Sequence, residues 1–280
     1  MSERKEFSDK KRIIIKIGSS SLFHIESGKL DFMKIDRLAR IISDLSNKGK
    51  EMILVSSGAQ ATAKSFLGMT YDKGDIPKRQ ACASIGQAQL ITLYQRMFAQ
   101  YGKTVAQVLL TGYTIHSELT RTNASNTFNE LLRLGAVPIV NENDTVTTKE
   151  IEFGDNDCLS AMVAVLTEAD LLIILSDIDG LYNDNPKINK DAELVHDVKC
   201  LDEHIMSMGK QTPGSNFGTG GMASKLEAAK IATSAGIDMV IVNGNNLFNI
   251  LDVLDGKEIG TFFHGSKEKI FKFMEFDIKE

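Results

Sequence analysis

Cysteines and long apolar runs are scarce in this sequence, and each shortage excludes a class of protein. The 280 residues include only three cysteines, which are dispersed and odd in number: Cys82, Cys158 and Cys200. They suggest neither a disulfide framework nor a metal-ligand spacing, so a reducing cytoplasm is the expected compartment. The longest apolar runs, such as LLIIL at 171–175, are far too short to span a bilayer.

An excess of positive charge is missing as well. The chain carries 32 lysines and arginines against 37 acidic residues, which gives a formal net charge of −5. A general nucleic-acid binder needs a basic surface that neutralises phosphates, so we expect no nucleic-acid partner. The charged amino-terminal segment MSERKEFSDKKR lacks the apolar core of a signal peptide, and we expect no membrane association. A negative net charge is still compatible with a local cluster of positive charges that forms a binding site.

The pattern along the chain alternates predicted strands with predicted helices. Short apolar runs that end at glycine or polar residues predict strands at 12–17, 52–56, 105–110, 137–141, 170–177, 238–244 and 260–263. Amphipathic stretches predict helices at 33–47, after Gly58, and at 78–100, 121–134, 157–168, 222–235 and 246–254. Repeated strand–helix–strand units predict an α/β fold, namely a three-layer αβα sandwich whose mainly parallel central sheet has about eight strands.

Polar residues gather where these strands end, which is where parallel sheets bind ligands. Lys16 lies inside the first strand, between isoleucines, where a buried ammonium needs an anionic partner. A structural ion pair would satisfy it, but its place at the strand's carboxyl end favours a phosphate ligand. The other clusters are Ser56–Gly58, Asn141–Asp144, Asp155–Asp157 and Ser176–Asp177. A helix cap or a turn explains each one singly, whereas together they favour a binding site.

The glycine-rich stretch GTGGMASK at 218–225 has features of a phosphate-binding loop but lacks the full context of the known phosphate motifs. The Walker pattern fails because the Gly-Lys-Thr at 102–104 lacks the required first glycine. The dinucleotide fingerprint matches from Gly218 to Ala223, but no strand precedes it. What remains is a helix start whose N–H groups attract an anion, with Lys225 leaning back towards them. The alternative is a plain glycine loop with Lys225 in solvent.

The order of motifs resembles the amino acid kinase family from about Lys11 to Thr261. The matching stretches are IIIKIGSSSL, ILVSSGAQ, IVNENDTV, FGDNDCLSA, LSDIDGLYNDNP and GTGGMASK. The combination of SSGA, NEND, GDND and GTGGM-x-x-K is most similar to the members that phosphorylate glutamate. Two departures, Gln60 after SSGA and Ser176 where threonine is common, remove no charged group.

The resemblance implies a division of the chain. One kinase domain is expected at 11–264, with a glutamate-binding part at about 11–165 and an ATP-binding part at about 166–264. A short tail at 265–280 stands where many members carry an RNA-binding-like PUA domain, which we expect to be absent here.

The resemblance also implies a role for individual residues. Lys16 and Lys225 would stabilise the phosphoryl group in transfer, and Asp157 would organise the two lysines. The residues that would bind glutamate are Ser57, Asn141, Asp144 and Asn156. The residues that would contact ATP are Lys16, Ser176, Asp177, Thr219, Gly220, Gly221, Met222, Ala223, Ser224 and Lys225. No residue is assigned as a metal ligand.

The implied reaction is phosphorylation of the γ-carboxylate of L-glutamate by ATP with Mg²⁺, the first step of proline biosynthesis. A carboxylate with a reference pKa of about 4.3 is already ionised at neutral pH, so no general base is needed. The sequence agrees with this, because its five histidines are isolated and none stands out as a proton acceptor. The resemblance further implies a homo-oligomer, either dimer or tetramer, and proline as a feedback inhibitor.

Two other functions stay open at this point. One is another member of the family, such as an acetylglutamate kinase or an aspartokinase; an acetylated substrate has no ammonium and would suit Asp144 poorly. The other is a non-catalytic sensor of amino acids or nucleotides on the same fold. Such a sensor would have no need of both lysines and Asp157.

Overall fold

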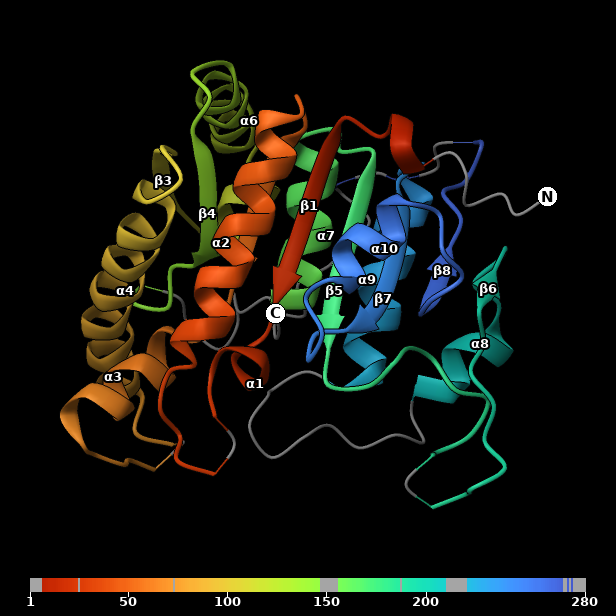
Figure 1. The fold of residues 1–280 in the computed structure, drawn as a ribbon, viewed down its shortest axis with the longest axis horizontal. Coiled ribbons are helices and arrows are strands. Elements are labelled where there is room, and N and C mark those ends of the chain that lie inside the picture. Colours follow the sequence, from red (N-terminus) through yellow and green to blue (C-terminus); the bar gives the residue numbers. More distant parts are fainter. Residues whose placement is uncertain are drawn as a thin grey trace.

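The central feature of the computed structural model is one sheet of eight strands with helices on both faces (Figure 1). The structure describes residues 7–24, 26–72, 74–146, 156–186, 188–209, 221–268, 271 and 273. Within these residues the strands are β1 Arg12–Ile17, β2 Glu51–Ser56, β3 Val105–Leu110, β4 Val137–Glu142, β5 Leu171–Ser176, β6 Asp197–Val198, β7 Asp238–Asn243 and β8 Thr261–Phe263. Their order across the sheet is β3-β4-β2-β1-β5-β7-β8-β6.

The sheet is mainly parallel, as the sequence predicts. Strand β1 lies near its middle, where it pairs in parallel with β2 on one side and with β5 on the other. Only β7 and β8 pair antiparallel among the described strands. The two-residue strand β6 is the one strand that the pattern did not predict, because so short a run carries no alternation.

Ten helices cover the sheet in the described part of the chain. They are α1 Ser19–Leu22, α2 Phe32–Asn47, α3 Ala59–Leu67, α4 Ile76–Ala99, α5 Gly112–His116, α6 Glu118–Arg133, α7 Asn156–Leu166, α8 Glu203–Met208, α9 Met222–Ser234 and α10 Asn249–Leu254. The seven predicted helices are all present, with ends within a few residues of those expected. The short helices α1, α5 and α8 were not predicted.

The alternation of side chains along β1 assigns each residue to one of two cores. Ile13, Ile15 and Ile17 belong to the core beneath α2, α4 and α10. Ile14 belongs to the opposite core, beneath α6, α7 and α9. Lys16 has the same parity as Ile14, so its side chain points to the face that α7 and α9 cover. Figure 1 shows α2 and α10 in front of the sheet and α7 behind it.

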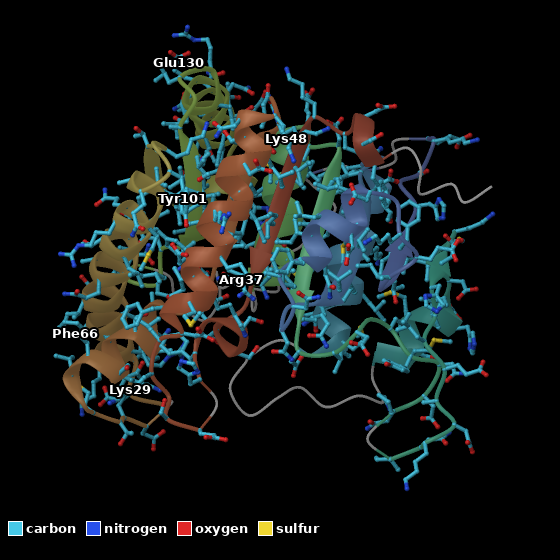
Figure 2. All side chains as sticks on the ribbon, viewed as in Figure 1. Lys29, Arg37, Lys48, Phe66, Tyr101 and Glu130 are labelled. Carbon is cyan, nitrogen blue, oxygen red and sulfur yellow. The ribbon has the colours of Figure 1, made fainter. Side chains whose placement is uncertain are left out.

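Charged side chains elsewhere stand on the outside of the helices (Figure 2). Lys48 pairs with Asp44 at the end of α2, and Glu130 pairs with Arg133 at the end of α6. Such exposed pairs contribute little to stability because water screens them. No described helix has the length and apolar character needed to cross a bilayer, and the three cysteines are free thiols.

Candidate active site

The described carboxyl ends of the neighbouring strands β1, β2, β4 and β5 meet at one edge of the sheet. In the register of the sheet Ile17 lies beside Ser56, and Lys16 lies between Val55 and Ile174. The chain leaves β1 at Gly18, whose backbone passes close to the Lys16 ammonium: a Cβ built on Gly18 would lie 3.7 Å from Lys16 Nζ. The edge therefore has a cationic group at its centre and a glycine that leaves space beside it.

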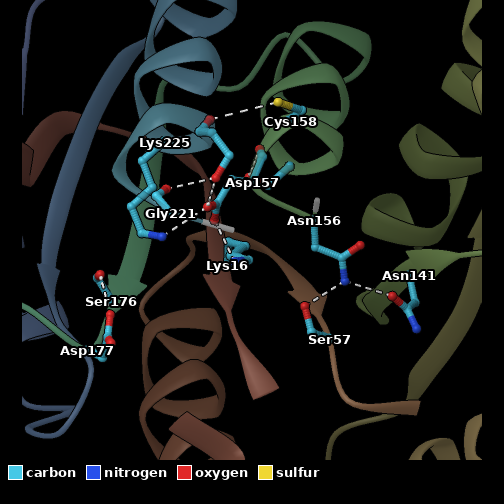
Figure 3. Close-up of polar contacts among 12 residues, drawn as sticks. Lys16, Ser57, Asn141, Asn156, Asp157, Cys158, Ser176, Asp177, Gly221 and Lys225 are labelled. Atoms are coloured by element: carbon cyan, nitrogen blue, oxygen red, sulfur yellow. Dashed lines mark hydrogen bonds and ion pairs between the residues drawn. The ribbon is translucent and has the colours of Figure 1, made fainter. Parts of the chain in front are cut away.

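Two lysines from distant parts of the chain meet on one carboxylate there. Lys16 Nζ lies 2.5 Å from Asp157 Oδ1, and Lys225 Nζ lies 3.1 Å from Asp157 Oδ2. Figure 3 shows Asp157 between the two lysine side chains. The sequence singled out these three residues, and the structure brings them together.

Helices α7 and α9 hold these groups in place. Asp157 lies in the first turn of α7, and Lys225 lies in the first turn of α9. Both helices pack on the same face of the sheet, to which Lys16 points. Because helical side chains lean towards the amino end, Lys225 reaches back to the start of its own helix.

Ser224 fixes the carboxylate further. Its Oγ lies 3.1 Å from Asp157 Oδ2 and 2.9 Å from the carbonyl oxygen of Gly221. The hydroxyl thus links the start of α9 to Asp157. The sequence suggested Ser224 as an ATP contact and did not indicate this bond.

The three charges of this cluster are almost completely buried. The exposed fractions of the side chains are 5% for Lys16, 0% for Asp157 and 8% for Lys225. Burial of a charge is costly unless another charge meets it, and Asp157 meets both ammonium groups at once. Among these three groups positive charge outnumbers negative charge, which suits an anionic ligand.

A second set of polar side chains continues the site towards β4. The Asn156 amide nitrogen donates to Ser57 Oγ at 2.7 Å and to Asn141 Oδ1 at 2.8 Å. Asn141 Nδ2 in turn donates to Gln87 Oε1 at 2.9 Å. The structure therefore joins three of the four residues predicted to bind glutamate. It adds Gln87, a buried residue of α4 that no local pattern indicated.

Asp144, the fourth predicted substrate ligand, follows the end of β4 by two residues. Burial raises the pKa of Tyr71 to about 12, and the charge of Asp144 makes a smaller contribution in the same direction. The Tyr71 hydroxyl donates to Gln60 Oε1 at 3.0 Å. Gln60, the departure noted in the sequence, thus has a partner in a loop near Asp144.

The predicted ATP contacts are only partly described. Thr219 and Gly220 lie outside the described residues, as does Asp155. Helix α9 begins at Gly221 without a side-chain cap, and Met222 packs its side chain into the core. At the end of β5, Ser176 Oγ lies 3.3 Å from Asp177 Oδ1. Figure 3 draws this pair below Lys225 in its view.

A metal ion finds no ready-made cage among the described residues. They contain no group of three or more histidine, cysteine or acidic side chains that could hold one. Mg²⁺ commonly keeps several waters and binds through one or two carboxylates plus substrate phosphates. Such a mode of binding does not depend on a cluster of protein ligands.

Comparisons with known proteins support one family. The amino acid kinase family model matches residues 11–243. A glutamate 5-kinase of Clostridium tetani is 48% identical over 265 residues, which cover 94% of this chain and 98% of that protein. Another, of Carboxydothermus hydrogenoformans, is 48% identical over 262 residues, covering 94% of this chain and 70% of that longer protein.

Solved structures support the fold. The UMP kinase of Bacillus anthracis superimposes with a TM-score of 0.64 at 15% identity, covering 92% of this chain and 97% of that one. At so low an identity the likeness concerns the fold alone. It confirms the predicted three-layer α/β architecture.

Proposed function

The chain belongs to the amino acid kinase family, and from that premise we propose that it transfers the γ-phosphoryl group of ATP to the γ-carboxylate of L-glutamate. The products are L-glutamyl 5-phosphate and ADP. Relatives that are 48% identical over nearly the whole chain are named glutamate 5-kinases. The family resemblance makes this the first step of proline biosynthesis.

The observation that carries the proposal is the pair of lysines held by Asp157. The acceptor carboxylate is ionised at neutral pH, so the difficulty of the reaction is repulsion between two anions. Phosphoryl transfer is catalysed mainly by positioning and by charge stabilisation. Lys16 and Lys225, fixed in a buried site, supply positive charge where the phosphoryl group must pass.

Asp157 acts as an organiser in this scheme and not as a base. Each of its carboxylate oxygens already lies against a lysine ammonium. An ionised glutamate γ-carboxylate has no proton to give up, so the reaction requires no base. The role of Asp157 is to hold the two ammonium groups close together despite their mutual repulsion.

The polar set at Ser57, Asn141 and Asn156 is the acceptor end of the proposed site. A hydroxyl and amide groups beside the lysine cluster can bind an amino acid through its carboxylate and ammonium. Asp144 supplies a carboxylate that matches the ammonium of glutamate. An N-acetylated substrate has no ammonium, so this acceptor end favours the free amino acid.

The donor end is formed by Lys16, Lys225 and the start of α9. The uncapped N–H groups of α9 attract the phosphates of ATP, as helix starts do for anions. Mg²⁺, when bound with the nucleotide, supplies further positive charge at the β- and γ-phosphates. Ser176 and Asp177, at the end of β5, stay predicted contacts for the nucleotide.

An assay of acyl phosphate formation tests the proposal. Purified protein is incubated with ATP, Mg²⁺ and hydroxylamine, which traps an acyl phosphate as a hydroxamate. L-glutamate, N-acetylglutamate and L-aspartate are compared as acceptors, and ADP release is followed in parallel. Of the three acceptors, we expect only L-glutamate to give rapid hydroxamate formation. Preference for another acceptor would favour a different family member, and no acceptor-dependent ADP release would favour a sensor.

Two finer features belong to the same proposal and rest on the family resemblance. Proline is proposed to inhibit the enzyme, and the protein is proposed to form a dimer or tetramer. Repeating the hydroxamate assay with added proline tests the first, and sedimentation at several protein concentrations tests the second. An activity indifferent to proline, or a monomer at all concentrations, would contradict the respective feature.

A further inference from the structure

Gln87 is a buried residue of helix α4, and its described side-chain hydrogen bond is to a neutral residue of the site. It is 9% exposed, and its Oε1 accepts from Asn141 Nδ2 at 2.9 Å. A hydrogen bond between side chains 54 positions apart links the middle of a packed helix to the end of β4.

The direction of each hydrogen bond in the chain determines the direction of the next. Because Gln87 accepts from Asn141 Nδ2, Asn141 must turn its oxygen Oδ1 towards Asn156. Asn156 therefore presents its nitrogen to Asn141, and the same nitrogen donates to Ser57 Oγ. An amide nitrogen has two hydrogens, and both are now used.

This arrangement leaves a defined set of groups for a ligand. Asn156 can meet a ligand only through Oδ1, which is an acceptor. Ser57 Oγ accepts from Asn156, so its own hydrogen is available to donate. Figure 3 shows the Asn156 nitrogen between Ser57 and Asn141, with its oxygen turned to the other side. An acceptor beside a donor matches an ammonium beside a carboxylate, which is the head group of a free amino acid.

We propose that Gln87 is a positioning residue for substrate specificity: through Asn141 it fixes Asn156 as an acceptor for the substrate ammonium and Ser57 as a donor to a substrate carboxylate. The inference rests on the proposed function, since it concerns how L-glutamate is distinguished from acids without an amino group. If Gln87 did not accept a hydrogen bond from Asn141, the side-chain amides of Asn141 and Asn156 could both rotate so that their oxygen and nitrogen atoms exchange places. Asn156 would then present N–H groups to the substrate ammonium.

The first test replaces Gln87 by methionine, which has a similar length and offers no comparable acceptor. We expect Gln87→Met to raise the KM for glutamate by about ten- to a hundredfold, because a buried amide loses its partner. The KM for ATP should stay unchanged. Glutarate, which lacks the ammonium, serves as a competitive inhibitor whose Ki is measured in the same variants. The ratio of the glutarate Ki to the glutamate KM should fall by a similar factor, because only glutamate loses a contact to its ammonium.

Two control variants separate this role from a merely structural one. Gln87→Glu keeps an oxygen acceptor facing Asn141 and should restore most of the glutamate preference. Gln95→Met changes an exposed glutamine on the same helix and should leave both constants unchanged. A glutamate KM and a glutarate ratio unchanged in Gln87→Met would overturn the proposal, as would an equal loss in Gln87→Glu.

A second variant tests the proposal even if Gln87→Met does not fold. Asn156→Asp has the same shape and adds a negative charge, so simple charge reasoning predicts tighter binding of the ammonium. The proposed arrangement of hydrogen bonds predicts weaker binding of glutamate. An aspartate at position 156 cannot donate to Asn141, and it accepts the Ser57 hydrogen that would otherwise be donated to the substrate. We expect a glutamate KM raised about tenfold or more; an equal or lower KM would overturn the proposal.

Failure of this inference can be told apart from failure of the proposed function. If the unaltered protein forms no hydroxamate from glutamate, the proposed function is wrong and the variants are not needed. If it does, and the variants keep its preference for glutamate over glutarate, the function stands and the role of Gln87 is wrong.

Discussion

At the scale of single residues, the sequence predicted side chains that belong to a local polar or charged motif and missed those that do not. Lys16 could be found because a charge inside a buried strand is conspicuous. Asp157 could be found because it belongs to a run of polar residues before a helix, where a single residue would suffice as a cap. Gln87 and Tyr71 could not, because a glutamine inside a helix and a tyrosine in a loop are ordinary features. Their significance depends on contacts with residues far away in the chain, and those contacts exist only once the helices are packed.

The first prediction concerns Asp157. Asp157→Asn keeps the shape but removes the charge that balances two buried ammonium groups. We expect kcat to fall about a hundredfold or more. We also expect the thermal midpoint to fall, because breaking a buried ion pair costs about 3–5 kcal/mol. ATP should raise the midpoint of the variant more than that of the unaltered protein, since its phosphates replace the lost charge.

Kinetics and thermal unfolding with and without ATP measure these effects. Asp44→Asn is the matched control, because it breaks an aspartate–lysine pair on the exposed surface, where Asp44 meets Lys48 at the end of α2. If Asp157→Asn kept both its kcat and its thermal midpoint, Asp157 would not be the organiser of the site.

The second prediction concerns Asp144. Asp144→Ala removes the carboxylate proposed to bind the substrate ammonium while leaving the lysine cluster intact. The KM for glutamate should rise about tenfold or more, because the ammonium loses a charged partner, while the KM for ATP stays the same. Steady-state kinetics with each substrate varied in turn would show this. A glutamate KM equal to that of the unaltered protein would remove Asp144 from the site.

At the scale of helices and strands, regular elements were predictable and their contacts were not. The seven strands and seven helices with clear periodicity were found in the sequence, and the parity of β1 places Lys16 on the face that holds Asp157. The close approach of α3 and α4 was not predictable, because it depends on a single glycine. A Cβ on Gly86 would lie 1.8 Å from the carbonyl oxygen of Ala59.

The third prediction follows from that approach. Gly86→Ala must push α3 away from α4, and overpacking of this kind costs about 1–3 kcal/mol or more. Because α3 begins two residues after Ser57 and Gly86 precedes Gln87, the glutamate KM should rise as well. Urea denaturation and kinetics measure both effects. Ser84→Ala, at an exposed position of the same helix, is the control; equal stabilities of the two variants would refute the expected clash.

The fourth prediction concerns pH at the other end of the sheet. Burial works to raise the pKa of Glu51, but hydrogen bonds from Lys11 and Arg12 outweigh it and leave that pKa below its ordinary value of 4.5. A lowered pKa in the folded state stabilises the protein above pH 4.5, and this contribution is lost as pH falls through the folded value.

Glu51→Gln removes the carboxylate without touching the site. Urea denaturation should show a lower free energy of unfolding for the variant at neutral pH. The difference from the unaltered protein should shrink well below pH 4.5, where Glu51 is protonated in both states. A difference that does not depend on pH would mean that the ion pairs of Glu51 contribute nothing.

At the scale of the whole molecule, the fold class was predictable, whereas the order of strands was not. Alternating strands and helices indicate a parallel sheet, but they do not say that β1 lies between β2 and β5. That order is what unites the site: Lys16 comes from β1, Asp157 from α7 and Lys225 from α9. The division into a glutamate-binding part and an ATP-binding part stays a prediction, and both parts share one sheet.

The most direct test of the central claim is phosphoryl transfer by Lys225→Met at saturating ATP and glutamate. The variant removes one of the two ammonium groups on Asp157 and keeps a side chain of similar length. We predict that hydroxamate formation disappears while ATP binding, measured by calorimetry, largely persists. Near-normal hydroxamate formation by this variant would contradict the claim that the paired lysines bring donor and acceptor together.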